Sequence, residues 1–290
     1  MPSVQQSPLY RAITDDKHFL HSSFRHDTST NTPPHILFDC DGLILDTEPI
    51  YSLAAISSLR HFTRSSAIPA DQLFPESLKL KVMGGTKSQV SQQMADHLNT
   101  LLSNHNNQQQ PLISADDWAT HTTPLETHHF SLGCPLMPGI VDLVSLVKSK
   151  GFKAAVATSS ARESFLLKSG PHSALFAAFD AITCGDDPEY SDPAANDSDR
   201  PQVKGKPHPS IFRTARHHLN RTAQHHGIVL EDSPNGVVAA LRSGHSCIWV
   251  PAKRGASFDL IDDILRFETV KDDLWVYRAD SLYEVIEALK

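Results

Sequence analysis

Short apolar runs alternate with longer amphipathic stretches along most of the chain, and this alternation predicts the fold class. Residues 36–38 form a short apolar run that is typical of a buried strand. From Ile140 onward, apolar residues recur at i, i+3, i+4 and i+7, which predicts a helix ending near Gly151. Similar strand candidates follow at residues 153–160, 180–185, 227–232 and 247–251. Strands that alternate with helices of this length indicate an α/β fold, with helices covering both faces of a parallel sheet.

One long segment departs from this pattern. Between the first strand and Cys134 strand signals nearly vanish, and helical periodicity dominates at residues 51–62 and 87–102. We interpret residues 49–134 as a helical cap inserted after the first strand. Residues 35–48 and 135–290 would then form one discontinuous catalytic core.

Two polar segments are predicted to lie outside the regular elements. Residues 1–34 are polar and have no clear period, so we expect a loosely ordered, flexible N-terminal tail. The stretch 190–203, rich in Asp, Pro, Ala and Ser, is predicted to be a flexible surface loop.

Charge and cysteine usage limit the classes of partner. The net charge of −7 argues against a nucleic-acid partner, since proteins that bind the phosphate backbone are usually basic. No apolar run approaches the roughly 18 residues of a membrane span, so we expect no membrane partner. The four cysteines are far apart and form no C-x-x-C, which favours a cytoplasmic location and argues against structural zinc. We also expect a monomer.

Charged and hydroxyl-bearing residues follow the predicted strands, where ligands bind in open parallel sheets. These residues are Asp39, Asp41, Thr158, Ser159, Lys206, Glu231 and Asp232. Carboxylate oxygens are suitable ligands for Mg²⁺, and hydroxyl and ammonium groups hold phosphate oxygens. A cation would also offset the repulsion between carboxylates placed so close together. The set therefore indicates a site that handles a phosphate with a hard cation.

Each motif taken alone has an ordinary structural explanation. Asp39 to Gly42 would form a turn, Thr158 would begin a helix, and Lys206 would be a surface lysine. Gly84-Gly85 is compatible either with a helix break or with a cap loop that faces the site. The functional interpretation rests on the complete set in its order along the chain.

The stretches DCDGL, VATSS, GKPHP and LEDSPNG, in that order, resemble the four motifs of the haloacid dehalogenase-like hydrolases. The resemblance covers about residues 35–255 and implies a Rossmann-like sheet with a mobile cap. It makes Asp39 the nucleophile that becomes phosphorylated and Asp41 the general acid and base. It also implies that Thr158, with Ser159 beside it, and Lys206 hold the phosphate.

The same resemblance implies a Mg²⁺ site. Its ligands would be Asp39, the backbone carbonyl of Asp41, and Asp232, with Glu231 acting directly or through water. Asp186 and Asp187 match an acidic stretch before the lysine motif. For Asp41 to work as an acid near neutrality, we expect the closing cap to desolvate it and raise its pKa above about 3.9.

LMPG, CGDDPE and DGLILDTE resemble the pseudouridine-5′-phosphatase branch of this family, which implies that a small phosphorylated metabolite, pseudouridine 5′-phosphate, is the substrate. Sugar-phosphate phosphatases and beta-phosphoglucomutase-like phosphomutases share much of this pattern and stay alternatives. A receiver domain would be shorter and uncapped, with another motif order. A dinucleotide-dependent dehydrogenase would need a G-x-G-x-x-G, which does not occur. A non-catalytic scaffold is not supported, because every catalytic position is filled.

Overall fold

The fold is built on one eight-stranded sheet in the order β1-β2-β8-β7-β6-β3-β4-β5. The computed structural model describes residues 4–6, 10–24, 34–64, 68–105, 112–190, 202–222, 225, 227–252, 256–265 and 273–290. Its strands are β1 (Val4–Gln6), β2 (Arg11–Thr14), β3 (His35–Phe38), β4 (Ala154–Ala157), β5 (Ala181–Thr183), β6 (Gly227–Glu231), β7 (Ser246–Trp249) and β8 (Trp275–Arg278). Neighbouring strands are parallel except for the antiparallel pair β1 and β2.

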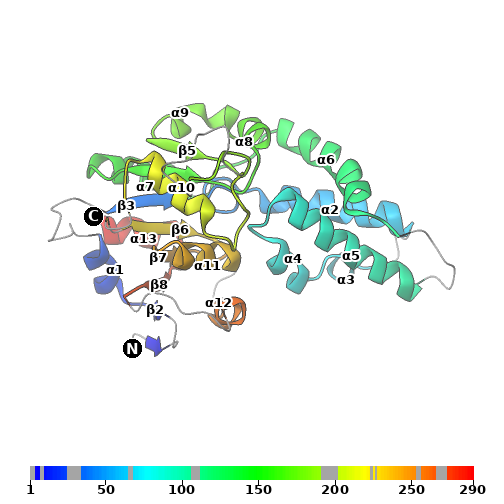
Figure 1. Ribbon diagram of the computed structural model, residues 1–290, viewed down its shortest axis with the longest axis horizontal. Helices are drawn as coiled ribbons and strands as arrows, with labels where there is room; N and C mark the ends of the chain where they lie inside the picture. Colours follow the sequence, from blue (N-terminus) through cyan, green and yellow to red (C-terminus); the bar gives the residue numbers. More distant parts are fainter. Residues whose placement is uncertain are drawn as a thin grey trace.

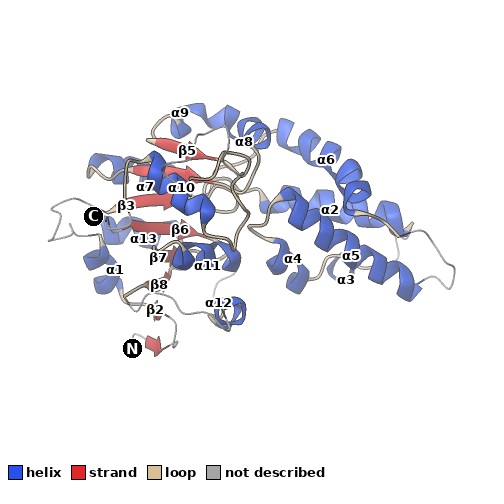
Figure 2. Ribbon diagram, in the orientation of Figure 1, coloured by secondary structure: helices blue, strands red, loops and turns tan. Residues whose placement is uncertain are grey.

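Helices cover both faces of this sheet, as the alternating pattern predicts (Figure 2). Those of the sheet region are α1 (Lys17–Ser23), α7 (Ile140–Ser149), α8 (Arg162–Ser169), α9 (Ser173–Phe176), α10 (Ser210–His218), α11 (Pro234–Arg242), α12 (Asp259–Leu265) and α13 (Leu282–Leu289), with a 3₁₀ turn at Gly170–His172. In β3, Ile36 and Phe38 pack into the cluster with α1, α7 and α13, whereas Leu37 packs into the cluster with α10, α11 and α12. The alternation of side chains along a buried strand thus builds two hydrophobic layers.

Five helices between β3 and β4 form a second unit, which lies to one side of the sheet in Figure 1. They are α2 (Glu48–Thr63), α3 (Ala70–Leu73), α4 (Glu76–Val82), α5 (Lys87–His105) and α6 (Ala115–Ser131). The unit has its own hydrophobic cluster, to which Leu59, Leu98 and Trp118 contribute from three of the helices. Its action as a mobile cap stays a prediction.

The N-terminal segment differs from the sequence-based expectation of a loosely ordered tail. Residues 10–24 contain β2 and α1, and β2 pairs in parallel with β8. Ile13 and Leu20 are fully buried in the core. The elements are too short to show a period, and the partner strand β8, which the sequence pattern also failed to reveal, lies near the other end of the chain. The expectation was therefore wrong for these residues.

Most of the predicted loop at 190–203 lies outside the described residues. Within the described part of the chain, no helix is long and apolar enough to cross a membrane.

Candidate active site

The candidate site lies at the carboxyl ends of the three central strands. Phe38 at the end of β3 is in register with Val156 in β4 and Leu230 in β6. The polar residues that follow these strands therefore meet at one edge of the sheet, as parallel topology requires. The structure divides the predicted residues there into two groups, one around Asp39 and one around Asp41.

The first group consists of three buried carboxylates and one ammonium. Oxygens of Asp39, Glu231 and Asp232 lie within 4.8 Å of one another, and these residues are at most 5% exposed. The Lys206 ammonium donates to both Asp39 and Glu231. Burial, reinforced by the neighbouring carboxylates, raises the pKa values of Asp39 and Asp232 well above the usual value, although Lys206 opposes the shift. With all three carboxylates ionised, the group would carry more negative charge than its one lysine balances.

The donor set of this group fits a hard divalent cation. Glu231 is already occupied, because one oxygen pairs with Lys206 and the other accepts two backbone N–H groups and the Ser233 hydroxyl at 3.0 Å each. Asp232 Oδ2 is buried and has no hydrogen-bond partner in the described part of the chain. A buried carboxylate oxygen of this kind needs a compensating charge or donor. Carboxylates beside the end of β3 could therefore hold a metal ion, with Asp232 offering the open ligand.

Gly42 allows the Asp232 carboxylate to approach the loop that follows β3. Gly42 has a φ of +87°, and a Cβ built on it would lie 2.0 Å from Asp232 Oδ2. Only glycine satisfies both conditions, since a side chain would be strained by the backbone angle and would clash with the carboxylate.

We expect Gly42→Ala to lower the free energy of unfolding by roughly 2–4 kcal/mol, from backbone strain and overpacking together. Gly151→Ala is the matched control, because Gly151 has a φ of +79° but a Cβ added to it would meet nothing within 4 Å. It retains the strain and omits the clash. Urea unfolding measures both variants, and equal losses of stability would contradict the steric role of Gly42.

The second group surrounds Asp41 with hydrogen-bond donors. Lys168 Nζ lies 2.5 Å from Asp41 Oδ1, while Ser160 and Thr158 donate to Oδ2 at 3.0 and 3.2 Å. Burial alone would raise the pKa of Asp41, but the Lys168 ammonium and the hydrogen bonds outweigh it and hold the pKa below its ordinary value. The expectation of a raised pKa was therefore wrong, because sequence reasoning missed Lys168 in α8. Nothing in the sequence pattern singled this lysine out, because α8 mixes three apolar residues with charged and hydroxyl-bearing ones.

Ser159 lies apart from both groups. Its hydroxyl donates to the Gly84 carbonyl at 2.8 Å, between α4 and α5. Asn235 at the start of α11 donates to the Met83 carbonyl at 2.9 Å. The loop that contains Gly84 and Gly85 is thus docked on the core and lines the site, which favours the cap-loop interpretation over a plain helix break.

Together the two units enclose a cavity of about 170 Å³ at this edge. The core contributes Asp39, Asp41 and Asp232 to its wall. Helices α2, α4, α5 and α6 contribute the opposite wall, which mixes apolar and charged side chains. The arrangement can hold a small molecule against the carboxylates.

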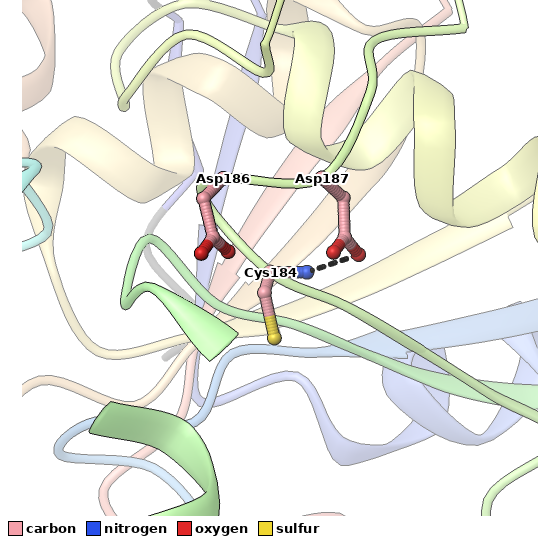
Figure 3. Close-up of side chains that lie close together, drawn as sticks. All are labelled: Cys184, Asp186 and Asp187. Carbon is pink, nitrogen blue, oxygen red and sulfur yellow. Dashed lines mark hydrogen bonds between the residues drawn. The ribbon is translucent and has the colours of Figure 1, made fainter. Parts of the chain in front are cut away.

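Asp186 and Asp187 form a separate cluster with Cys184 after β5, drawn in Figure 3. The Asp187 carboxylate accepts the Cys184 backbone N–H at 2.8 Å and pairs with Arg162 at 2.5 Å. Asp186 accepts the Arg162 backbone N–H at 2.8 Å. Because these acids are already paired, they support a role in holding the start of α8 against the β5 loop.

Comparisons with known proteins agree with this geometry. A family profile described as haloacid dehalogenase-like hydrolase matches residues 33–244. The probable pseudouridine-5′-phosphatase of Drosophila melanogaster is 29% identical over 221 residues, which cover 76% of this chain and 82% of that protein. The mitochondrial (DL)-glycerol-3-phosphatase 1 of Arabidopsis thaliana is 29% identical over 230 residues, 79% of this chain and 67% of that protein.

A solved structure shows the same fold. The crystal structure of CbbY from Rhodobacter sphaeroides in complex with phosphate has a TM-score of 0.56 and 24% identity, covering 88% of this chain and 98% of that one. The family profile spans well over half of the chain and includes the end of β3, the Lys206 loop and the acidic pair at the end of β6. The chain therefore belongs to the haloacid dehalogenase-like hydrolase family.

Proposed function

We propose that the protein is a phosphoric monoester hydrolase that works through a phospho-aspartate on Asp39. The observation that carries the proposal is the placement of Asp39 and Asp41 in one enclosed cavity. Asp39 is held by Lys206, and Asp41 lies two residues further along the same loop. The names of the two phosphatase relatives support this reaction class.

The proposed reaction has two displacements at phosphorus. An oxygen of Asp39 bonds to phosphorus as the ester P–O bond breaks, and Asp41 gives its proton to the leaving alcohol oxygen. Asp41 then takes a proton from water, which attacks the phosphoryl group and releases inorganic phosphate and free Asp39. The incoming phosphate dianion would raise the pKa of Asp41, because it places a like charge next to the carboxylate.

Lys206 and Thr158 are proposed to hold the phosphoryl oxygens. Lys206 already lies against Asp39, and Thr158 is fully buried after β4 with its hydroxyl on Asp41. Charge stabilisation of this kind in an enclosed site can contribute several kcal/mol. Ser159 would join them only if its hydroxyl left the Gly84 carbonyl.

Mg²⁺ is the proposed metal cofactor. Asp39 and Asp232 would hold it with their carboxylates, and Asp41 with its backbone carbonyl. Glu231 would position Lys206 and the loop after β6, because both of its oxygens already accept protein donors. When bound, the cation neutralises phosphate charge so that an anionic carboxylate can approach phosphorus.

The charges on the cap side of the cavity favour a small substrate with an uncharged leaving group. Two acids and two lysines line it, Glu48 and Glu126 with Lys79 and Lys87, so their charges cancel when both acids are ionised. Lys79 pairs with Glu48 at 3.3 Å. A phosphomutase must hold a doubly phosphorylated intermediate, and this wall lacks the positive excess that a second phosphate would favour.

We propose that Glu126 recognises the leaving group of the substrate. It lines the cavity, and its carboxylate has no hydrogen bond or ion pair to any residue that the structure describes. Burial raises its pKa to about 7, with Lys87 and Lys168 opposing the shift. Trp118 and Met94 add an apolar surface to the same cavity. A hydroxylated or N–H-bearing group that also has an apolar face suits this wall, and pseudouridine 5′-phosphate meets both conditions.

The test is a comparison of kcat/KM with Mg²⁺ for pseudouridine 5′-phosphate, uridine 5′-phosphate, DL-glycerol 3-phosphate, glucose 6-phosphate and glucose 1,6-bisphosphate. We expect pseudouridine 5′-phosphate to be the best substrate and the bisphosphate to be at least about tenfold poorer. A tenfold preference for a hexose or glycerol phosphate would reject the substrate and leave the phosphatase standing. Interconversion of glucose 1- and 6-phosphate without phosphate release would favour the mutase.

We expect Glu126→Gln to lower kcat/KM for the best substrate by roughly 10–100-fold, the loss that follows from removing a hydrogen bond to a charged group. On p-nitrophenyl phosphate, which lacks hydroxyl and N–H groups on its ring, the loss should be much smaller. Glu163→Gln, at an exposed position of α8, is the control and should change neither substrate. Equal losses on both substrates would contradict a role for Glu126 in reading the leaving group.

A further inference from the structure

Lys168 is a fully buried lysine whose ammonium is surrounded by oxygen atoms. Its Nζ lies 2.5 Å from Asp41 Oδ1, 2.7 Å from the Ser160 hydroxyl and 3.1 Å from the Tyr51 hydroxyl. Burying an ammonium costs several kcal/mol, and an apolar residue of similar volume would often serve a core at least as well. Stability alone is therefore a weak explanation for a lysine at this position.

The surroundings of Lys168 connect the core to the two ends of the cap. Its ammonium lies 5.6 Å from the ring centroid of Tyr51 and 5.5 Å from that of Phe130, within the range of cation–π attraction. Tyr51 is in the first turn of α2, just after the chain leaves the core, and Phe130 is in the last turn of α6, just before it returns. The two rings also contact each other edge to face at 5.2 Å.

The two carboxylate oxygens of Asp41 accept hydrogen bonds from different kinds of donor. Oδ1 accepts from the Lys168 ammonium at 2.5 Å and, at a longer 3.5 Å, from the Tyr51 hydroxyl. Oδ2 accepts from the neutral hydroxyls of Ser160 and Thr158. Charge-assisted hydrogen bonds are roughly twice as strong as neutral ones. Oδ1 is thus firmly held, whereas Oδ2 can exchange its partners for a substrate oxygen at lower cost.

We infer that Lys168 is a positioning residue that anchors Asp41 through Oδ1 and presents Oδ2 for proton transfer, with Tyr51 tying this arrangement to the docked cap. The inference rests on the proposed phosphatase reaction. Proton transfer depends on a donor within about 2.6–3.2 Å of the leaving oxygen, so a carboxylate that is free to rotate loses part of its effect. Lys168 acts through Asp41 and takes no part in the bonds to phosphorus.

The test uses the dependence of the rate on the leaving group. An alkyl ester needs a proton at its leaving oxygen, whereas p-nitrophenolate leaves without one. For Lys168→Met, we expect kcat/KM to fall by about 100-fold on DL-glycerol 3-phosphate, within the range of general acid catalysis, and by less than about fivefold on p-nitrophenyl phosphate. Lys153→Met, at a half-exposed lysine that pairs with Asp180, is the control and should alter neither rate. Equal losses on the two esters would overturn the inference.

Two further variants keep the test decisive if Lys168→Met does not fold. Tyr51→Phe removes only one hydroxyl, and we expect kcat/KM to fall about three- to tenfold on DL-glycerol 3-phosphate and less on p-nitrophenyl phosphate. No loss, or equal losses on the two esters, would overturn the inference. In an Asp41→Asn background, Lys168→Arg should cost nothing more on the alkyl ester, because the group being positioned is gone. Additive losses would overturn it. A wild-type protein that releases no phosphate from either ester or from pseudouridine 5′-phosphate would instead reject the proposed function.

Discussion

Replacing Asp39 with asparagine is expected to reduce phosphate release from every substrate to background, a fall of at least about 10³-fold. The amide keeps the shape of the side chain but cannot form the acyl phosphate on which the proposed reaction depends. The fold should survive, because the change removes one of three mutually repelling buried carboxylates, while Lys206 keeps its contact with Glu231. Steady-state turnover and thermal unfolding, measured on the same preparation, check both parts.

The covalent intermediate gives a direct readout of the same residue. Acid-quenched wild-type protein should retain label from a ³²P-labelled ester, and Asp39→Asn should retain none. Asp142→Asn, an exposed change in α7, is the matched control and should behave as wild type. If Asp39→Asn kept a tenth of the wild-type rate, or kept the label, the nucleophile would have to be sought elsewhere.

The sequence predicted the central part of the fold and the position of the site for one physical reason. Short apolar runs mark buried strands, and in a parallel sheet the residues after such runs meet at one edge. Asp39, Thr158 and Asp232 could therefore be placed together from the sequence alone. Strands β2 and β8 could not be predicted, because their pairing joins the two ends of the chain.

The details that decide the chemistry were less accessible. Lys168 gives no pattern in the sequence, since its role depends on the packing of α8 against the ends of α2 and α6. Without it, the pKa of Asp41 was expected to move in the wrong direction. Ser159 belongs to the correct motif, yet its hydroxyl contacts the cap loop, because the close approach of Gly84 to the core places a carbonyl there. Motifs locate such groups but do not determine their partners.

The cap illustrates the same limit for specificity. Helical periodicity predicted α2 and α5, because both helices bury apolar residues in a common cluster. The helix faces that line the cavity carry polar residues, and helical periodicity alone does not distinguish one polar residue from another. Glu126 became a candidate only when the structure placed it in the cavity without a protein partner among the residues it describes. The choice of leaving group is therefore the least predictable property from this one sequence.

Removing the divalent cation is expected to have an effect on the rate as large as the loss of Asp39, and it also makes a prediction about stability. Excess chelator should abolish turnover, and added Mg²⁺ should restore it. Mg²⁺ at 100 times its Kd should stabilise the fold by about 2.7 kcal/mol, which appears as a rise in unfolding midpoint without any substrate. Asp232→Asn should lose this rise, because it removes the open carboxylate ligand. Asp186→Asn, in the paired cluster after β5, should keep it.

The pH dependence of the metal-free protein gives an independent check on the same cluster. Burial raises the pKa of Asp232 well above that of the unfolded chain, about 3.9, so the folded state binds more protons than the unfolded state at intermediate pH. Stability contributed by this group is therefore present at low pH and is lost as the pH rises above about 4. Without metal, wild type should lose stability relative to Asp232→Asn between about pH 4 and 7.5, and Mg²⁺ should reverse the difference at the upper end of this range. The cation would lie away from the end of β6 if two results were found together. The stability difference between wild type and Asp232→Asn would not change with pH across this range, and Mg²⁺ would raise the unfolding midpoint of Asp232→Asn as much as that of wild type.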